Sequence, residues 1–93
     1  MSITLKRKWK IYLWEWDPTN GEYVYRDRYG EEIEARSEDE LWKLIEKRLA
    51  KMARDAKKEG WDCELNPQGE LVCVKYGKYG YDERIIGYDI NPV

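Results

Sequence analysis

The chain has 93 residues, enough for one domain with one hydrophobic core. Its 17 basic and 19 acidic side chains give a net charge of −2, which argues against a protein that binds duplex nucleic acid through a broad basic surface. The absence of histidine excludes a Ser-His-Asp or Cys-His nucleophile, and two cysteines are too few for a structural zinc site.

The rest of the composition bears on origin and location. The chain has 5 Trp and 8 Tyr but no Phe, and 39% of its residues are charged. A highly charged chain with few labile residues resembles a thermostable protein from a hyperthermophile, and the regular caps and turns described below equally suit a de novo design. No apolar run approaches the ~20 residues of a membrane span, and no signal peptide begins the chain. We therefore expect no membrane partner and, if the sequence is natural, a cytoplasmic protein.

The first predicted strand, residues 3–16, separates two kinds of side chain. At a period of two, its segment "KWKIYLWEW" (8–16) places Trp9, Ile11 and Leu13 on one side, together with Ile3 and Leu5 upstream. The other side runs from basic to aromatic, with Lys6, Lys8, Lys10, Tyr12, Trp14 and Trp16.

A hairpin loop, "DPTNGE" (17–22), connects this strand to the second one. The loop predicts a register in which Trp16 faces Tyr23, Trp14 faces Tyr25 and Lys10 faces Tyr29. This register adds the tyrosines to the aromatic side and Val24 to the aliphatic side. Gly30 is expected to end the second strand, and "EEIEAR" (31–36) to form a short third strand with Ile33 and Ala35 on a common side.

A helix is predicted over residues 38–59. Ser37 and Glu40 form a capping box at its start, and Gly60 is the expected stop. Its apolar positions recur at helical spacing, at Leu41, Ile45, Leu49, Met52 and Ala56.

A second hairpin is predicted around the turn "NPQG" (66–69), which places Leu65 opposite Leu71 and Cys63 opposite Cys73. The cysteines then form a non-hydrogen-bonded pair with Cα atoms about 4.5 Å apart, within the range of a disulfide. A disulfide and a reduced, packed pair both remain open, and a redox-active pair is the least favoured alternative.

The last part of the chain contains a small repeat, "KYGKYGYDE" (75–83), whose glycines favour a loop or a kinked strand. A final strand is expected over residues 84–90. The predicted order β-β-β-α-β-β-β describes a single α+β domain, residues 1–93, in which one helix packs on a mostly antiparallel sheet of five or six strands.

No catalytic residue, metal site or cofactor is predicted, so we do not expect an enzyme. The adjacent carboxylates, such as Asp82 and Glu83, are interpreted as solvated surface. One helix covers only one face of the sheet, and the sequence does not decide which. A covered aliphatic side leaves the rings exposed, whereas covered rings leave the aliphatic side for a dimer.

Three hypotheses follow for function. The first is a module that binds single-stranded DNA or RNA, with lysines along the backbone and rings stacked on bases. Its site residues are Lys6, Lys8, Lys10, Tyr12, Trp14, Trp16, Tyr23 and Tyr25. The second is a protein-protein interaction module, binding itself or another protein through an exposed apolar sheet face. The third is a hyperstable scaffold without a ligand.

Overall fold

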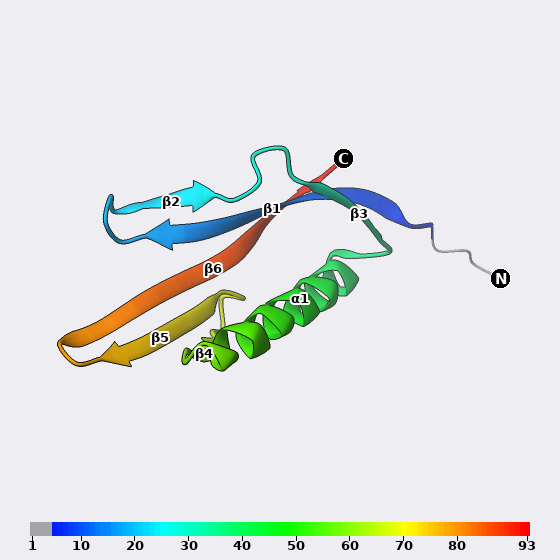
Figure 1. The fold of residues 1–93 in the computed structure, drawn as a ribbon. Helices are drawn as coiled ribbons and strands as arrows, with labels where there is room; N and C mark the ends of the chain where they lie inside the picture. Colours follow the sequence, from blue (N-terminus) through cyan, green and yellow to red (C-terminus); the bar gives the residue numbers. More distant parts are fainter. Residues whose placement is uncertain (1–4) are drawn as a thin grey trace.

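The computed structural model describes residues 5–93, which form a six-stranded sheet and one helix. In chain order the elements are β1 (Arg7–Asp17), β2 (Glu22–Tyr25), β3 (Glu31–Ala35), α1 (Glu38–Lys58), β4 (Asp62–Leu65), β5 (Leu71–Gly77) and β6 (Gly80–Pro92) (Figure 1). Every strand pair is antiparallel, and the order across the sheet is β2-β1-β6-β5-β4, with β3 also paired to β1. The α+β fold class and the order of elements are confirmed.

The two short strands β2 and β3 pair with successive halves of the same edge of β1. β2 pairs in the predicted register, with Trp14 opposite Tyr25. The predicted pair of Lys10 and Tyr29 is wrong, because Lys10 lies opposite Glu32 of β3. The chain leaves the sheet between β2 and β3, where Asp27 Oδ1 accepts a hydrogen bond from the Tyr29 amide at 3.0 Å.

Helix α1 begins and ends close to the predicted residues. The Ser37 hydroxyl accepts a hydrogen bond from the Glu40 amide at 3.1 Å, as an N-cap does. Three acidic residues in the first turn and two lysines in the last complement the helix dipole. Gly60 follows the helix at φ +93°, a conformation that glycine adopts without strain.

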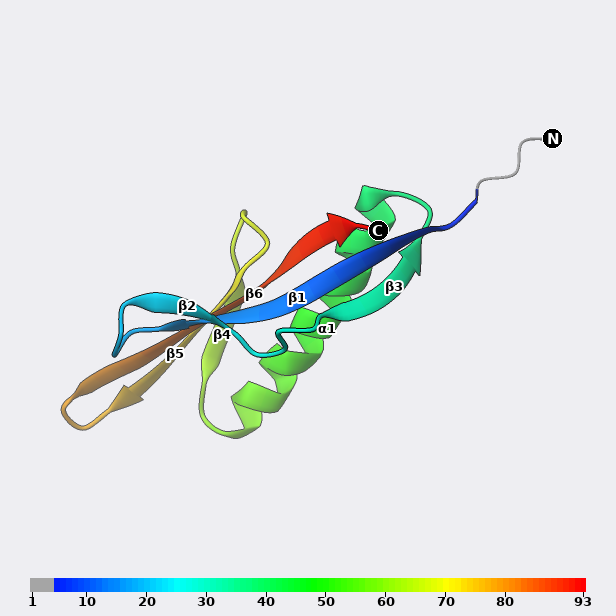
Figure 2. The same ribbon diagram turned by 90° about the horizontal axis from the view of Figure 1, so that it is seen from above.

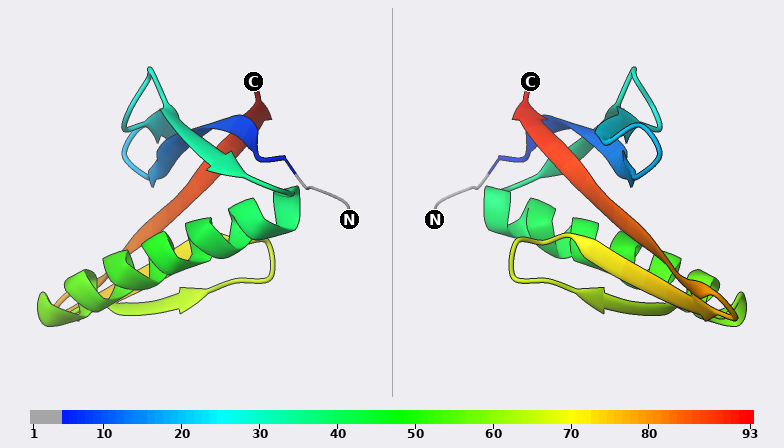
Figure 3. Two further views of the ribbon diagram at one scale, coloured as in Figure 1. Left: turned by 90° about the vertical axis from the view of Figure 1, so that its right-hand side faces the viewer. Right: turned by 90° about the vertical axis from the view of Figure 1, so that its left-hand side faces the viewer.

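The helix covers the aliphatic side of the sheet, which answers the question that the sequence left open. Figures 2 and 3 show α1 lying along one side of the twisted sheet, and Figure 3 shows β4 and β5 beside it. Ile11 from β1 and Ile45 from α1 are both at most 1% exposed. The whole buried core comprises Trp9, Ile11, Ala35, Leu41, Ile45, Leu49, Leu71, Cys73 and Ile86.

The aliphatic side is shorter than predicted. Strand β1 begins at Arg7, and Leu5 lies before it with 77% of its surface exposed. Ile3 lies outside the described residues. Val24 is 42% exposed, because it sits in the short strand β2 rather than in the central part of the sheet that makes up the core. Only the middle of the predicted apolar side therefore contributes to the core.

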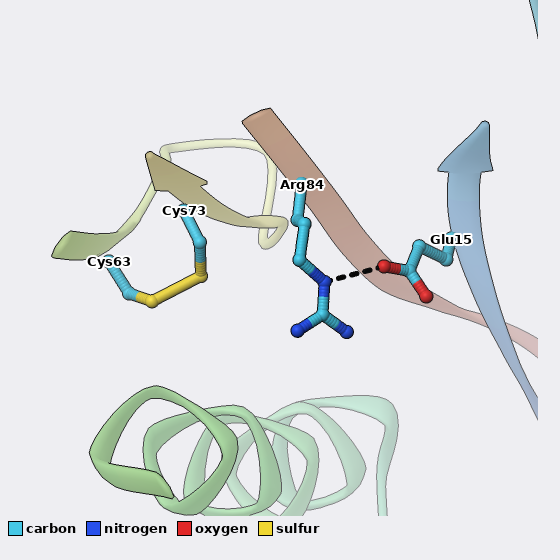
Figure 4. Close-up of a disulfide and its surroundings, with 4 residues drawn as sticks. All are labelled: Glu15, Cys63, Cys73 and Arg84. Atoms are coloured by element: carbon cyan, nitrogen blue, oxygen red, sulfur yellow. Dashed lines mark hydrogen bonds and ion pairs between the residues drawn. A yellow bond between two sulfur atoms is a disulfide. The ribbon is translucent and has the colours of Figure 1, made fainter. Parts of the chain in front are cut away.

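The second hairpin forms in the predicted register, with Cys63 opposite Cys73 and Leu65 opposite Leu71. The two cysteines form a disulfide, and their Cα atoms are 4.0 Å apart (Figure 4). Since Cys73 is only 1% exposed, the disulfide joins the edge strand β4 directly to the core.

Residues 75–83 form a continuous hairpin instead of the predicted loop or kinked strand. Gly77 pairs with Gly80, so the two glycines flank a two-residue turn and do not interrupt a strand. Strand β6 is consequently longer than predicted and begins at Gly80. The β5–β6 hairpin separates from the β1–β2 hairpin beyond the pair Glu15–Ile86, and the two form a fork (Figure 1).

Candidate functional site

We call the sheet side that faces away from α1 the open face. Because side chains alternate along each strand, the residues that flank the core positions belong to it. In β1 and β2 these residues are Lys8, Lys10, Tyr12, Trp14, Trp16, Tyr23 and Tyr25. In β3 to β6 they are Glu32, Glu34, Asp62, Glu64, Val72, Val74, Tyr76, Tyr81, Glu83, Ile85, Gly87, Asp89 and Asn91.

Five aromatic side chains of the candidate site lie together on this face, as the sequence predicts. The Tyr23 ring packs edge-on against Trp14 and Trp16, with centroid distances of 4.8 and 4.7 Å. Tyr12 and Tyr25 make a similar contact at 6.0 Å. Within residues 5–93 no second layer covers these rings, and Tyr23 and Tyr25 remain 59% and 51% exposed.

Two glycines hold rings of this cluster against the backbone. A Cβ atom built on Gly87, opposite Trp14, would lie 2.4 Å from the Trp14 ring. A Cβ atom on Gly30 would lie 2.8 Å from the Tyr12 ring. The two rings therefore occupy space that a side chain at either position would fill. From the sequence, Gly30 is expected only to end the second strand, and no role is predicted for Gly87.

A hydrogen bond fixes the position of Tyr25 as well. Its hydroxyl donates to the Asp89 carboxylate, which connects β2 to β6 across β1. This hydrogen bond, with the negative charge of Asp89, raises the pKa of Tyr25. Asp89 is absent from the predicted site, because the pairing of β1 with β6 is a long-range feature.

The lysines of the candidate site do not form a basic surface. Lys8 lies opposite Glu34 and Lys10 opposite Glu32, while Lys6 precedes β1. The described residues of the open face comprise two lysines and six carboxylates, a net charge of −4. A face with this charge repels a phosphate backbone.

A charged cluster that the sequence pattern does not predict lies on the helix side of the fork. Glu15 accepts hydrogen bonds from Arg84 Nε and Arg26 Nε, each at 2.7 Å. Burial alone would raise the pKa of Glu15, but these bonds from Arg84 and Arg26 outweigh it and lower the pKa. Side chains alternate along β1, so Glu15 lies on the aliphatic side with Ile11 and Leu13. A carboxylate at such a position was the sequence signal that could have indicated this cluster.

Within residues 5–93, no group of three or more carboxylate or cysteine side chains is placed to hold a metal ion. No helix in this part of the chain is long and apolar enough to cross a membrane. Comparisons with protein-family models, with curated proteins and with solved structures give no match to this chain.

Proposed function

We propose that this chain is a protein-interaction module that docks through the open face, and that the occupant of this face is a second copy of the chain. The observation that carries the proposal is the aromatic cluster around Trp14, which no other part of the described chain covers. Tyr and Trp are enriched in protein interfaces and dominate their binding energy. Rings already fixed over Gly87 and Gly30 lose little side-chain entropy on binding.

The exposed area of the chain supports an interface of ordinary size. The chain exposes 7185 Å², whereas a compact monomer of 11.3 kDa exposes about 5,700 Å². When about 600 Å², the area of four fully exposed residues, is subtracted for residues 1–4, roughly 900 Å² of excess remains. A standard interface buries about 800 Å² on each partner, so a dimer would remove an area of this size.

The net charge of −4 is the same on the open face of both copies, so the argument for a second copy rests on where the charges lie within the face. On the open face, Lys8 and Lys10 lie near the N-terminal end of β1, and the rings of Trp14 and Trp16 lie near its other end. A twofold axis that lies in the plane of the interface, perpendicular to β1, places the lysine end of each copy over the aromatic end of the other. Lysines over exposed rings and near the carboxylates of the opposite copy are favourable contacts.

Sedimentation equilibrium between about 1 μM and 1 mM tests the proposal. We expect a mass of twice the 11.3 kDa chain at the upper concentrations. A mass of one chain throughout the range would overturn self-association. If the chain stays monomeric alone but binds a different protein, the open face is an interaction surface whose occupant is not a second copy.

Titration with a single-stranded oligonucleotide, followed by tryptophan fluorescence at two salt concentrations, tests the alternative. We expect no change up to high micromolar strand. Quenching with a slope of about −2 to −3 in log affinity against log salt would instead support binding by the three lysines. A monomer that leaves the oligonucleotide unbound would favour a scaffold without a ligand.

A further inference from the structure

We infer that the cavity between the C-terminal half of α1 and the sheet is a binding site for a small monocarboxylate with an apolar tail, whose carboxylate pairs with Arg84. The cavity lies on the helix side of the sheet, so its occupation does not depend on the proposed use of the open face. Its lining combines core side chains with the Arg26–Glu15–Arg84 cluster.

The cavity has an apolar floor and a definite size. Leu71, Cys73 and Ile86 form the floor and are between 1% and 7% exposed, while Met52 and Ala56 of α1 form the facing wall. The volume is approximately 240 Å³. The space is open to solvent, so we take hexanoate, a carboxylate with a short apolar tail, as the probe.

Arg84 retains hydrogen-bonding capacity toward this space. Its Nε donates to Glu15, and the guanidinium lies over the Trp61 ring at 5.6 Å. Figure 4 shows the two terminal nitrogens of Arg84 directed toward α1. Neither nitrogen donates a hydrogen bond to another side chain or backbone group of residues 5–93. A planar guanidinium with both terminal nitrogens available binds a carboxylate in a bidentate manner.

The Arg26–Glu15–Arg84 cluster by itself favours an anion, while Asp55 and Glu59 bring the net charge of the whole lining to −1. Arg26 and Arg84 share one carboxylate, so the cluster has one positive charge without a paired anion. Asp55 and Glu59 also line the cavity, but both are exposed and neither lies within 4.0 Å of an arginine nitrogen in the described chain. A ligand carboxylate at Arg84 completes an alternating array of two cations and two anions, and its tail covers the apolar floor.

Titration with hexanoate, followed by the amide NMR signals of the cavity residues, tests the inference. We expect saturable shifts at the floor residues, with a dissociation constant on the order of 0.1–1 mM. Hexanol and hexylamine serve as probes with the same tail but without the negative charge, and we expect each to bind at least tenfold more weakly. Equal binding of hexanol, or stronger binding of hexylamine through Asp55 and Glu59, would overturn the assignment.

Two variants connect binding to the cavity. Arg84→Gln should weaken hexanoate binding at least tenfold, whereas Lys78→Gln removes the same charge from the distant hairpin turn and should leave binding unchanged. Ala56→Phe fills the space without altering the arginines and should also abolish binding. Hexanoate binding that persists in folded Arg84→Gln or Ala56→Phe protein would contradict the inference, and Ala56→Phe decides the matter if Arg84→Gln does not fold.

Discussion

Trp9 and Trp14 belong to the same strand and lie on opposite sides of the sheet, with very different surroundings. Trp9 is 6% exposed within the core that α1 completes, whereas Trp14 rests on Gly87 of its own sheet. On the helix side, stability comes from burial between two layers. On the open face, rings pack within a single layer and leave accessible surface. The same alternation in one strand thus provides a core and a candidate interface.

The largest effect is expected from a cavity in the core. Ile45→Ala removes a fully buried side chain and should lower the free energy of unfolding by about 3–4 kcal/mol. Tyr23→Ala on the open face should cost the monomer less than about 1 kcal/mol, because Tyr23 is 59% exposed. Urea unfolding at low micromolar concentration measures both losses. Equal losses would remove the distinction between the two faces.

Reduction of the disulfide acts on the helix side alone. Cys63 and Cys73 are 10 residues apart, and a loop of this length predicts a stabilisation of about 2–3 kcal/mol. Thermal unfolding with and without reductant measures the difference. The Cys63→Ser and Cys73→Ser double variant should be insensitive to reductant. A wild-type transition that reductant leaves unchanged would show that the disulfide adds nothing.

Gly87→Ala tests the packing of rings within the open face. The new methyl group overlaps the Trp14 ring and should lower the free energy of unfolding by about 1–3 kcal/mol. In a Trp14→Ala background the same substitution should cost much less, since the ring is absent. Additive losses in this double-mutant cycle would contradict the packing of the ring on Gly87.

The Glu15 cluster predicts a smaller effect that depends on pH. The pKa of Glu15 is lower in the folded chain than its ordinary value of 4.5, so the carboxylate contributes stability above that value and loses it as the pH falls. Because both arginines are partly exposed, we expect at most about 1 kcal/mol. Glu15→Gln should be less stable at pH 7 and should lose less stability between pH 5 and 3. Parallel profiles would contradict this role.

Local signals predicted much of the fold. The "DPTNGE" turn gave the register of Trp16 with Tyr23, Ser37 gave the start of the helix, and "NPQG" gave the cysteine pair. These features depend on neighbours within a few residues in the sequence.

Long-range features could not be predicted in the same way. Both sides of β1 are apolar enough to be buried, so only the packed structure decides which side α1 covers. The side-chain turn at Asp27 changes the partner of Lys10, and alternation does not reveal such a turn. The role of Gly87 requires the pairing of β1 with β6, which lie at opposite ends of the chain. The charge and shape of the candidate site depend on these features.

The claim that the open face is the interaction surface is tested most directly by two substitutions at neighbouring residues. Tyr23 lies on the open face and Val24 on the helix side of the same strand, and both are exposed. Sedimentation equilibrium of Tyr23→Glu and Val24→Glu compares the same added charge on the two faces. We predict that Tyr23→Glu raises the dissociation constant of the dimer at least tenfold, to give mostly single chains, whereas Val24→Glu remains dimeric like the wild type. Dimerisation lost in Val24→Glu and retained in Tyr23→Glu would contradict the account.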